Sequence, residues 1–225
     1  MDFDSFVLAA ATADLAEEPA AREHADAVEF RMDLASDPLA SLRGYAGALP
    51  VLATNRVEWE GGETPDTPER LAALETALET PLVEAIDVEL RAIREGNAGR
   101  VVEHARDRGV AVVVSVHDFE GTPTPERMRD LLAAACDYGD VGKLAVTAES
   151  PDDVLDLLTV TRAATRSGDR VATMAMGEPG RHSRAVAPLY GSRIGYAPVD
   201  PAAATAPGQY DLATLADLVE RLQSG

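Results

Sequence analysis

The sequence almost lacks lysine. Of its 20 Lys and Arg residues one is a lysine, Lys143, and the rest are arginines. This lysine lies in an apolar run, residues 141–146, that is typical of a buried strand. A desolvated lysine amine can act as a nucleophile, whereas a guanidinium stays charged. Lys143 is therefore a candidate Schiff-base former, and the alternative is a structural lysine whose ammonium reaches solvent.

Cysteine and long apolar runs are also scarce. The single cysteine, Cys136, excludes an internal disulfide and lies in a helical run, where we expect it to pack in the core. No apolar run approaches the length of a membrane-spanning helix. The N-terminus has no basic region followed by an apolar run, so no secretory signal is predicted. We expect a cytoplasmic protein without a membrane partner.

Positive charge is outnumbered, since 39 Asp and Glu residues give a formal net charge of −19. Such a charge argues against nucleic acid as a partner. The acidic residues are spread along the chain, and arginine is used in place of lysine. Together these features favour a protein of a halophilic cytoplasm, because net charge is a property that halophiles exploit. The alternative is an ordinary acidic protein.

Strand-like and helical runs alternate from end to end. The expected strands are 6–11, 27–33, 51–56, 82–88, 110–116, 141–146, 171–176 and 193–197, and the expected helices are 14–25, 38–46, 67–79, 91–108, 124–137, 151–166 and 211–223. Eight strands with intervening helices predict an α/β protein, a (β/α)8 TIM barrel forming one domain over residues 1–225. An open doubly wound sheet is the alternative, although no G-x-G-x-x-G motif follows the first strand.

Polar residues gather at the ends of the predicted strands, where barrels carry their chemistry. Glu29, Arg31 and Asp33 alternate along the second strand, so they are expected to point to the inner face. They could bind a polar ligand or form a structural ion-pair ladder. His117 ends the fifth strand and is a better acid–base candidate than His182, which lies in a loop.

The segment after the seventh strand carries glycines and two arginines, Arg181 and Arg184. Arginine forks suit either a phosphate or a carboxylate, so we expect an anion site here. No His, Cys or Asp pair has convincing metal-ligand spacing, and no metal or other cofactor is expected.

In this order, these pieces resemble the type I 3-dehydroquinate dehydratase family. The resemblance covers nearly the whole chain, and each motif is weak by itself. The matching segments are Glu29-Phe30-Arg31-Met32-Asp33, Arg56 with Glu60-Gly61-Gly62, Asp87-Val88-Glu89, Ser115-Val116-His117-Asp118-Phe119 with Thr122-Pro123, Lys143, Met174-Ala175-Met176-Gly177 through Ser183-Arg184, and Ala206-Pro207-Gly208-Gln209.

The resemblance implies a TIM barrel that dehydrates 3-dehydroquinate to 3-dehydroshikimate in the shikimate pathway. Lys143 would form an imine with the substrate ketone, His117 would transfer protons, and Glu60 would orient His117. The substrate would be held by Glu29, Arg31 and Arg56 at ring hydroxyls, by Arg184 and Gln209 at the carboxylate, and by Met174 and Met176 near the imine. The family is commonly dimeric, so a homodimer is expected.

Two departures from the family pattern are visible. Thr205 stands where a serine is common, which keeps a hydroxyl for substrate binding. Tyr196 stands where a phenylalanine is usual. Two other classes compete with this interpretation: another Schiff-base barrel, such as a class I aldolase or transaldolase, and a non-catalytic barrel that binds a small acid.

Overall fold

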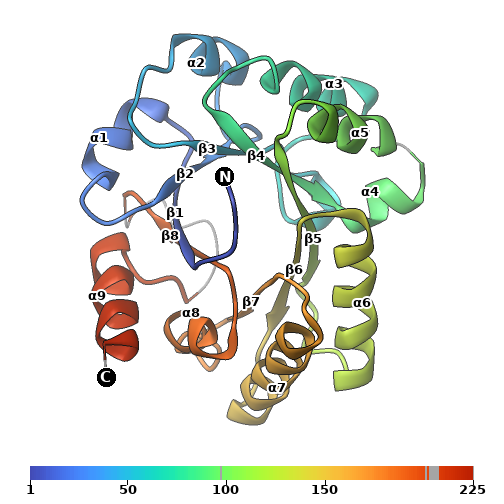
Figure 1. Ribbon diagram of the computed structural model, residues 1–225, viewed down its shortest axis with the longest axis vertical. Helices are drawn as coiled ribbons and strands as arrows, with labels where there is room; N and C mark the ends of the chain where they lie inside the picture. Colours follow the sequence, from blue (N-terminus) through green and yellow to red (C-terminus); the bar gives the residue numbers. More distant parts are fainter. Residues whose placement is uncertain (97, 201, 203–207, 225) are drawn as a thin grey trace.

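A computed structural model of the chain describes residues 1–96, 98–200, 202 and 208–224. Eight parallel strands form a ring, and helices surround it (Figure 1). The strands are β1 (Val7–Thr12), β2 (Ala27–Arg31), β3 (Val51–Thr54), β4 (Val83–Glu89), β5 (Ala111–Asp118), β6 (Val141–Thr147), β7 (Val171–Met176) and β8 (Ile194–Pro198). The predicted (β/α)8 barrel is confirmed, and all eight expected strands overlap observed ones.

The ring closes between its first and last strands but is weakly bonded at one seam. Hydrogen-bonded neighbours run in the order β7-β6-β5-β4-β3-β2-β1-β8. Between β7 and β8 the contact begins just before β8, where the Arg193 amide donates to the Val171 carbonyl at 2.7 Å. The Ser192 hydroxyl accepts a hydrogen bond from the Thr173 amide at 2.9 Å. A side chain thus supplies part of the bonding that a strand ladder supplies elsewhere.

The helical segments follow the strands and cover the outside of the barrel (Figure 1). They are η1 (Leu15–Glu17), α1 (Glu18–Ala21), α2 (Pro38–Gly44), η2 (Glu58–Glu60), α3 (Pro68–Ala77), α4 (Leu90–Arg94), α5 (Gly99–Asp107), α6 (Pro125–Tyr138), α7 (Pro151–Ser167), α8 (Ser183–Val186), η3 (Ala187–Tyr190) and α9 (Leu212–Gln223). The longest, α7, starts at a capping box in which Ser150 and Asp153 bond each other's backbone amides, and Pro151 opens its first turn.

One helix that was predicted to be continuous is interrupted. The run 91–108 is two helices, α4 and α5, because Gly96 adopts a φ of 87° after α4 ends. Glycine adopts this left-handed conformation at no steric cost, and it ends helices for that reason. The expected helix 14–25 is also shorter, with a single turn of 3-10 helix leading into α1.

The core has two layers, and strand alternation separates them. Phe30 of β2 packs outward in the larger apolar cluster beneath the helices. Ala9, Ala27 and Ala85 point into the barrel with Tyr196, in a second cluster that Phe3 joins. Small side chains opposite Tyr196 leave room for its ring, since Ala9 is its direct neighbour across β1 and β8. No helix in the described part of the chain combines the length and apolarity needed to cross a bilayer.

Candidate active site

A cavity opens among side chains near the carboxyl ends of the strands, with an empty volume of about 570 Å³. Parallel barrels carry their sites at this end because the following loops supply polar groups. The candidate residues that line the cavity are Glu29, Arg31, Arg56, Glu60, His117, Lys143, Met174, Met176, Arg184 and Gln209. Thr205, also a candidate, lies outside the described residues. Side chains from β2, η2, β5, β6, β7 and α8, together with Arg56 and Gln209, therefore converge on one space.

Lys143 is buried in this cavity, with 4% of its surface exposed. Its Nζ lies 3.0 Å from Asp87 Oδ2. On another side, Nζ lies 4.5 Å from the centre of the Tyr196 ring, a cation–π distance. The amine is thus held between a carboxylate from β4 and an aromatic face from β8. Strand β6 fixes the position of the Lys143 backbone.

Asp87 is the anionic partner that keeps Lys143 in place. Its Oδ1 accepts from Ser115 Oγ at 2.7 Å and lies 2.7 Å from Arg56 Nη2. Burial acts to raise the pKa of Asp87, but the charges of Arg56 and Lys143 outweigh it and hold that pKa below its usual range. Asp87 therefore stays ionised under ordinary conditions and offers a fixed negative charge next to the amine.

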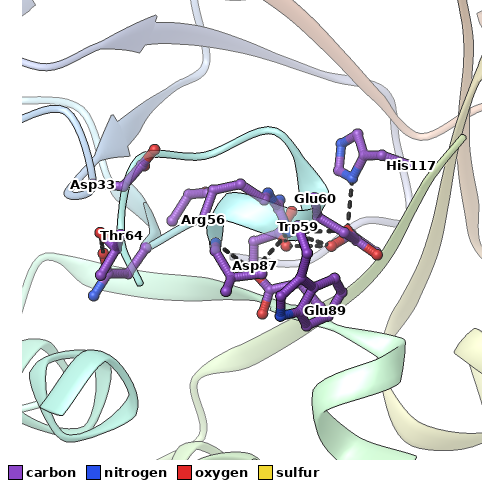
Figure 2. Close-up of polar contacts among 12 residues, drawn as sticks. Asp33, Arg56, Trp59, Glu60, Thr64, Asp87, Glu89 and His117 are labelled. Atoms are coloured by element: carbon purple, nitrogen blue, oxygen red, sulfur yellow. Dashed lines mark hydrogen bonds and ion pairs between the residues drawn. The ribbon is translucent and has the colours of Figure 1, made fainter. Parts of the chain in front are cut away.

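The charges continue as a buried alternating chain, in which Arg56 lies between Asp87 and Glu89 (Figure 2). Arg56 Nη1 lies 3.2 Å from Glu89 Oε1, and Glu89 Oε2 lies 2.9 Å from Arg70 Nη1. Arg70 comes from α3, outside the barrel, and its side chain is fully buried. Buried charges require such pairing, because each ion removed from water costs several kcal/mol unless it is compensated. Arg70 was not predicted as a buried partner, since a lone arginine in a helical run resembles a surface residue.

His117 and Glu60 form a close pair, with 2.8 Å between His117 Nδ1 and Glu60 Oε2 (Figure 2). Burial raises the pKa of Glu60 to about 8. Burial, together with the nearby charges of Arg56 and Lys143, lowers the pKa of His117 well below its usual value. A single proton lies in this 2.8 Å hydrogen bond, either on His117 Nδ1 or on Glu60 Oε2. The remaining imidazole nitrogen, Nε2, is then the atom available for proton transfer.

A glycine turn lets Glu60 reach His117. Gly61 follows η2 with a φ of 77°, in the left-handed region. A Cβ on Gly61 would come 2.5 Å from Cζ of Phe119. Phe119 stacks on His117, with 5.9 Å between ring centres and 10° between ring planes. The backbone conformation therefore favours glycine here, and the missing Cβ also leaves room for the Phe119 ring.

Arg184 is a buried guanidinium without a counter-ion among the described residues. It is 4% exposed, and its Nε and Nη2 atoms have no hydrogen-bond partner there. Burial lowers its pKa to about 10. Arg184 follows β7 in α8, where neighbouring Ser183 accepts from the Ala175 amide at 2.8 Å. An unpaired buried cation that lines a cavity is suited to bind an anion.

The other sequence candidates divide between the cavity and its surroundings. Glu29 accepts from Thr54 Oγ1 at 3.0 Å, and Arg31 pairs with Asp33 at 2.6 Å, so part of this group is a structural ion pair. Arg181 stacks on Tyr210 at 4.2 Å and is not among the lining residues. His182 is exposed and also outside the lining set. Within the described residues, no group of three or more His, Cys, Asp or Glu side chains is placed to hold a metal ion.

Comparison with protein families gives a match over residues 6–224 to the family described as Type I 3-dehydroquinase. A 3-dehydroquinate dehydratase of Haloarcula marismortui is 63% identical over 227 residues, covering 100% of this chain and 99% of the relative. That of Halobacterium salinarum is 52% identical over 226 residues, covering 99% of this chain and 100% of the relative. Both relatives come from halophilic archaea.

Solved structures agree with these sequence matches. The 3-dehydroquinate dehydratase of Geobacillus kaustophilus superposes with a TM-score of 0.87 at 29% identity, covering 98% of this chain and 92% of that one. The type I 3-dehydroquinate dehydratase of Clostridium difficile, solved with covalently modified comenic acid, gives a TM-score of 0.86 at 27% identity, covering 98% and 93%.

Proposed function

The chain belongs to the type I 3-dehydroquinase family, and from that premise we propose that Lys143 binds its substrate as a Schiff base. The reaction is the dehydration of 3-dehydroquinate, a hydro-lyase step of the shikimate pathway. This membership decides against the two alternatives, an aldolase-like barrel and a non-catalytic acid-binding barrel. What remains to be assigned is the role of each side chain.

The observation that carries the proposal is the position of the only lysine. Lys143 is buried in the same cavity as the His117–Glu60 pair and the unpaired Arg184. These supply an amine nucleophile, an acid–base group and an anion site. Dehydration next to a ketone needs these three functions, because a carbanion equivalent must form, a proton must move and the acid must be oriented.

In the first steps Lys143 attacks the ketone carbon and water leaves, giving an iminium cation. The adjacent Asp87 carboxylate and the Tyr196 ring face both stabilise positive charge at this nitrogen. His117 Nε2 then removes a proton from the carbon next to the imine carbon. The iminium nitrogen accepts the electron pair, so an enamine forms where a bare ketone would give a costly enolate.

In the last steps the enamine expels the ring hydroxyl, and His117 returns the proton so that water departs. Glu60 holds the imidazole through Nδ1, which fixes the ring orientation in both directions of proton transfer. Water then hydrolyses the imine, and Lys143 is freed. Each proton taken up by His117 is released within the cycle, so the enzyme returns to its starting state.

Substrate binding is assigned by the chemistry of the lining groups. Arg184 and Gln209 bind the carboxylate, and Thr205 adds a hydroxyl. Glu29, Arg31 and Arg56 bind ring hydroxyls, while Met174 and Met176 pack against the ring near the imine. Arginine suits the carboxylate because its planar fork can donate two parallel hydrogen bonds.

Borohydride trapping tests the Schiff base. With 3-dehydroquinate and borohydride, the protein should lose activity and gain the mass of one reduced ligand at Lys143. Lys143→Arg keeps the charge but cannot form an imine, so it should neither turn over nor trap ligand. Arg181→Lys is a matched control, because it adds a lysine outside the lining residues and should not trap. Normal turnover by Lys143→Arg would refute the mechanism.

We also propose that the protein acts as a cytoplasmic homodimer. The support is the family resemblance alone. Sedimentation equilibrium in molar salt measures the mass directly, and a single monomer mass at micromolar concentration would rule the dimer out.

A further inference from the structure

Tyr196 brings a hydroxyl into the substrate cavity that has no partner among the described residues. The residue is 4% exposed, its side chain lines the cavity, and its Oη is buried without a hydrogen bond. The ring is fixed, since Tyr196 lies in β8 opposite Ala9 and its face is 4.5 Å from Lys143 Nζ. The tyrosine therefore lies beside the amine that would carry the imine, with its ring in contact distance of Nζ.

An unpaired buried hydroxyl is unfavourable unless a ligand uses it. Removing a hydroxyl from water without a compensating hydrogen bond destabilises the folded state, and phenylalanine would fill the same space without that cost. The nearby charged groups are already engaged: Glu29 accepts from Thr54, and Asp87 contacts Arg56, Ser115 and Lys143. Neither carboxylate bonds the tyrosine. The position thus carries a polar atom that packing alone does not need.

We propose that Tyr196 is a substrate-binding residue whose hydroxyl hydrogen-bonds the substrate hydroxyl on the carbon next to the imine carbon. This inference rests on the Schiff base at Lys143, because that bond places the substrate ring beside the tyrosine. A phenol both donates and accepts, so it can pair with a hydroxyl in either orientation. A site that hydrogen-bonds a substrate hydroxyl discriminates strongly against analogues that lack it.

The tyrosine ring and its hydroxyl have separable roles. The ring face stabilises the cation at Nζ, and a phenylalanine ring would do the same. The hydroxyl alone distinguishes this chain from one with phenylalanine at position 196. Tyr196→Phe therefore isolates the hydrogen bond, whereas Tyr196→Leu removes the hydrogen bond and the ring face together.

Tyr196→Phe should lower activity without lowering stability. Its kcat/KM for 3-dehydroquinate should fall about tenfold, the size of one hydrogen bond. Its Tm should stay the same or rise, because an unpaired buried hydroxyl is removed. Tyr45→Phe is the matched control: Tyr45 Oη donates to the Leu49 carbonyl at 2.8 Å, away from the cavity. That variant should lose stability and keep its kcat/KM.

A substrate analogue completes the test. With a deoxy analogue that lacks the hydroxyl next to the ketone, wild type and Tyr196→Phe should have the same affinity, measured by the concentration that half-saturates borohydride trapping. A difference that persists with the analogue, or a lower Tm in Tyr196→Phe, would show that the hydroxyl supports the fold and would overturn the inference. Failure of the wild type to trap 3-dehydroquinate would instead count against the Schiff base.

Discussion

Arg184 is a cation that has been moved out of water before its anion arrives. Burying this charge destabilises the free protein, and burial also lowers the pKa of Arg184 to about 10. A carboxylate that enters the cavity would offset this destabilisation by accepting hydrogen bonds from Nε and Nη2. The side chain is therefore arranged for a ligand more than for stability, since no carboxylate of the described residues neutralises it.

Arg184→Ala should raise KM for 3-dehydroquinate by about 10- to 100-fold, the range for a hydrogen bond to a charged group. Steady-state kinetics measure this directly. Arg181→Ala is the control, because Arg181 stacks on Tyr210 and should leave KM nearly unchanged. If inorganic phosphate protects the wild type from trapping better than ring carboxylic acids do, the site binds phosphate and the carboxylate assignment is wrong.

The His117–Glu60 pair predicts how activity depends on pH. With two protons the pair carries one at Nε2, so His117 cannot accept a proton from the substrate. With one proton, held at Nδ1 by ionised Glu60, Nε2 is free to act as the base. Because the pKa of Glu60 is raised to about 8, the one-proton form grows as the pH rises through about 8. Activity should increase over the same interval.

The corresponding measurement is kcat between pH 5.5 and 9.5 for wild type and Glu60→Gln. The wild-type profile should rise with an apparent pKa near 8, and the variant should lose this step because glutamine does not titrate. A wild-type kcat that is constant from pH 6 to 9 would contradict the assigned coupling of the two side chains.

For single residues, the alternation of polar and apolar side chains predicted which of them face the barrel interior, but it did not predict which side chains contact one another. Alternation along β2 indicated that Glu29 and Arg31 point inward, and they line the cavity. The sequence could not indicate that Asp87 rather than Glu89 reaches Lys143, because both lie on the same face of β4. Which of the two carboxylates contacts Lys143 depends on how far each side chain extends from β4, past β5, toward β6. The role of Arg70 could not be predicted either, since it arrives from a helix outside the barrel.

Among the elements, strands were easier to predict than helix boundaries. Runs such as 171–176 are apolar on both faces because a parallel barrel strand is covered by helices outside and side chains inside. The division of α4 from α5 was missed, although Gly96 is a recognisable helix-ending signal. Amphipathic periodicity continues across that break, so the pattern alone favoured one helix.

The seam between β7 and β8 gives a prediction for stability. Ser192→Ala removes the acceptor of the buried Thr173 amide, which should cost about 1–3 kcal/mol of unfolding free energy. Urea denaturation measures the change. Ser167→Ala is the matched control, because the Ser167 hydroxyl lies on the exposed surface of α7 and should change stability by less than about 0.5 kcal/mol. Equal effects of the two substitutions would mean that the seam does not depend on Ser192.

For the molecule as a whole, a net charge of −19 dominates the electrostatics. Like charges spread over a small protein repel one another and weaken the compact state. The Debye length falls from about 30 Å at 0.01 M salt to about 3 Å at 1 M, so molar salt screens most of this repulsion. The buried Arg70–Glu89–Arg56 chain is shielded from the solvent and should respond little.

Stability should therefore rise with salt. Between 0.05 and 2 M KCl we expect a gain of about 2–3 kcal/mol, which corresponds to a Tm increase of about 5–10 °C. Calorimetry measures the Tm of wild type and of Lys143→Arg, which should show the same salt response because the effect arises at the surface. A Tm that stays constant over this range would reject the halophilic interpretation and leave the catalytic assignment unaffected.

The scarcity of lysine also determines how the protein reacts with amine-directed reagents. Its two primary amines are the side chain of Lys143, 5% exposed, and the terminal amine of Met1, a partly buried residue whose amine lies 2.7 Å from Glu84 Oε2. Both amines are paired with carboxylates, so acylating agents, aldehyde cross-linkers and cyanate find few reactive groups on the surface. A small carbonyl compound that fits the cavity would label one side chain and no other. For this protein, amine chemistry is a selective probe of the cavity that holds Lys143.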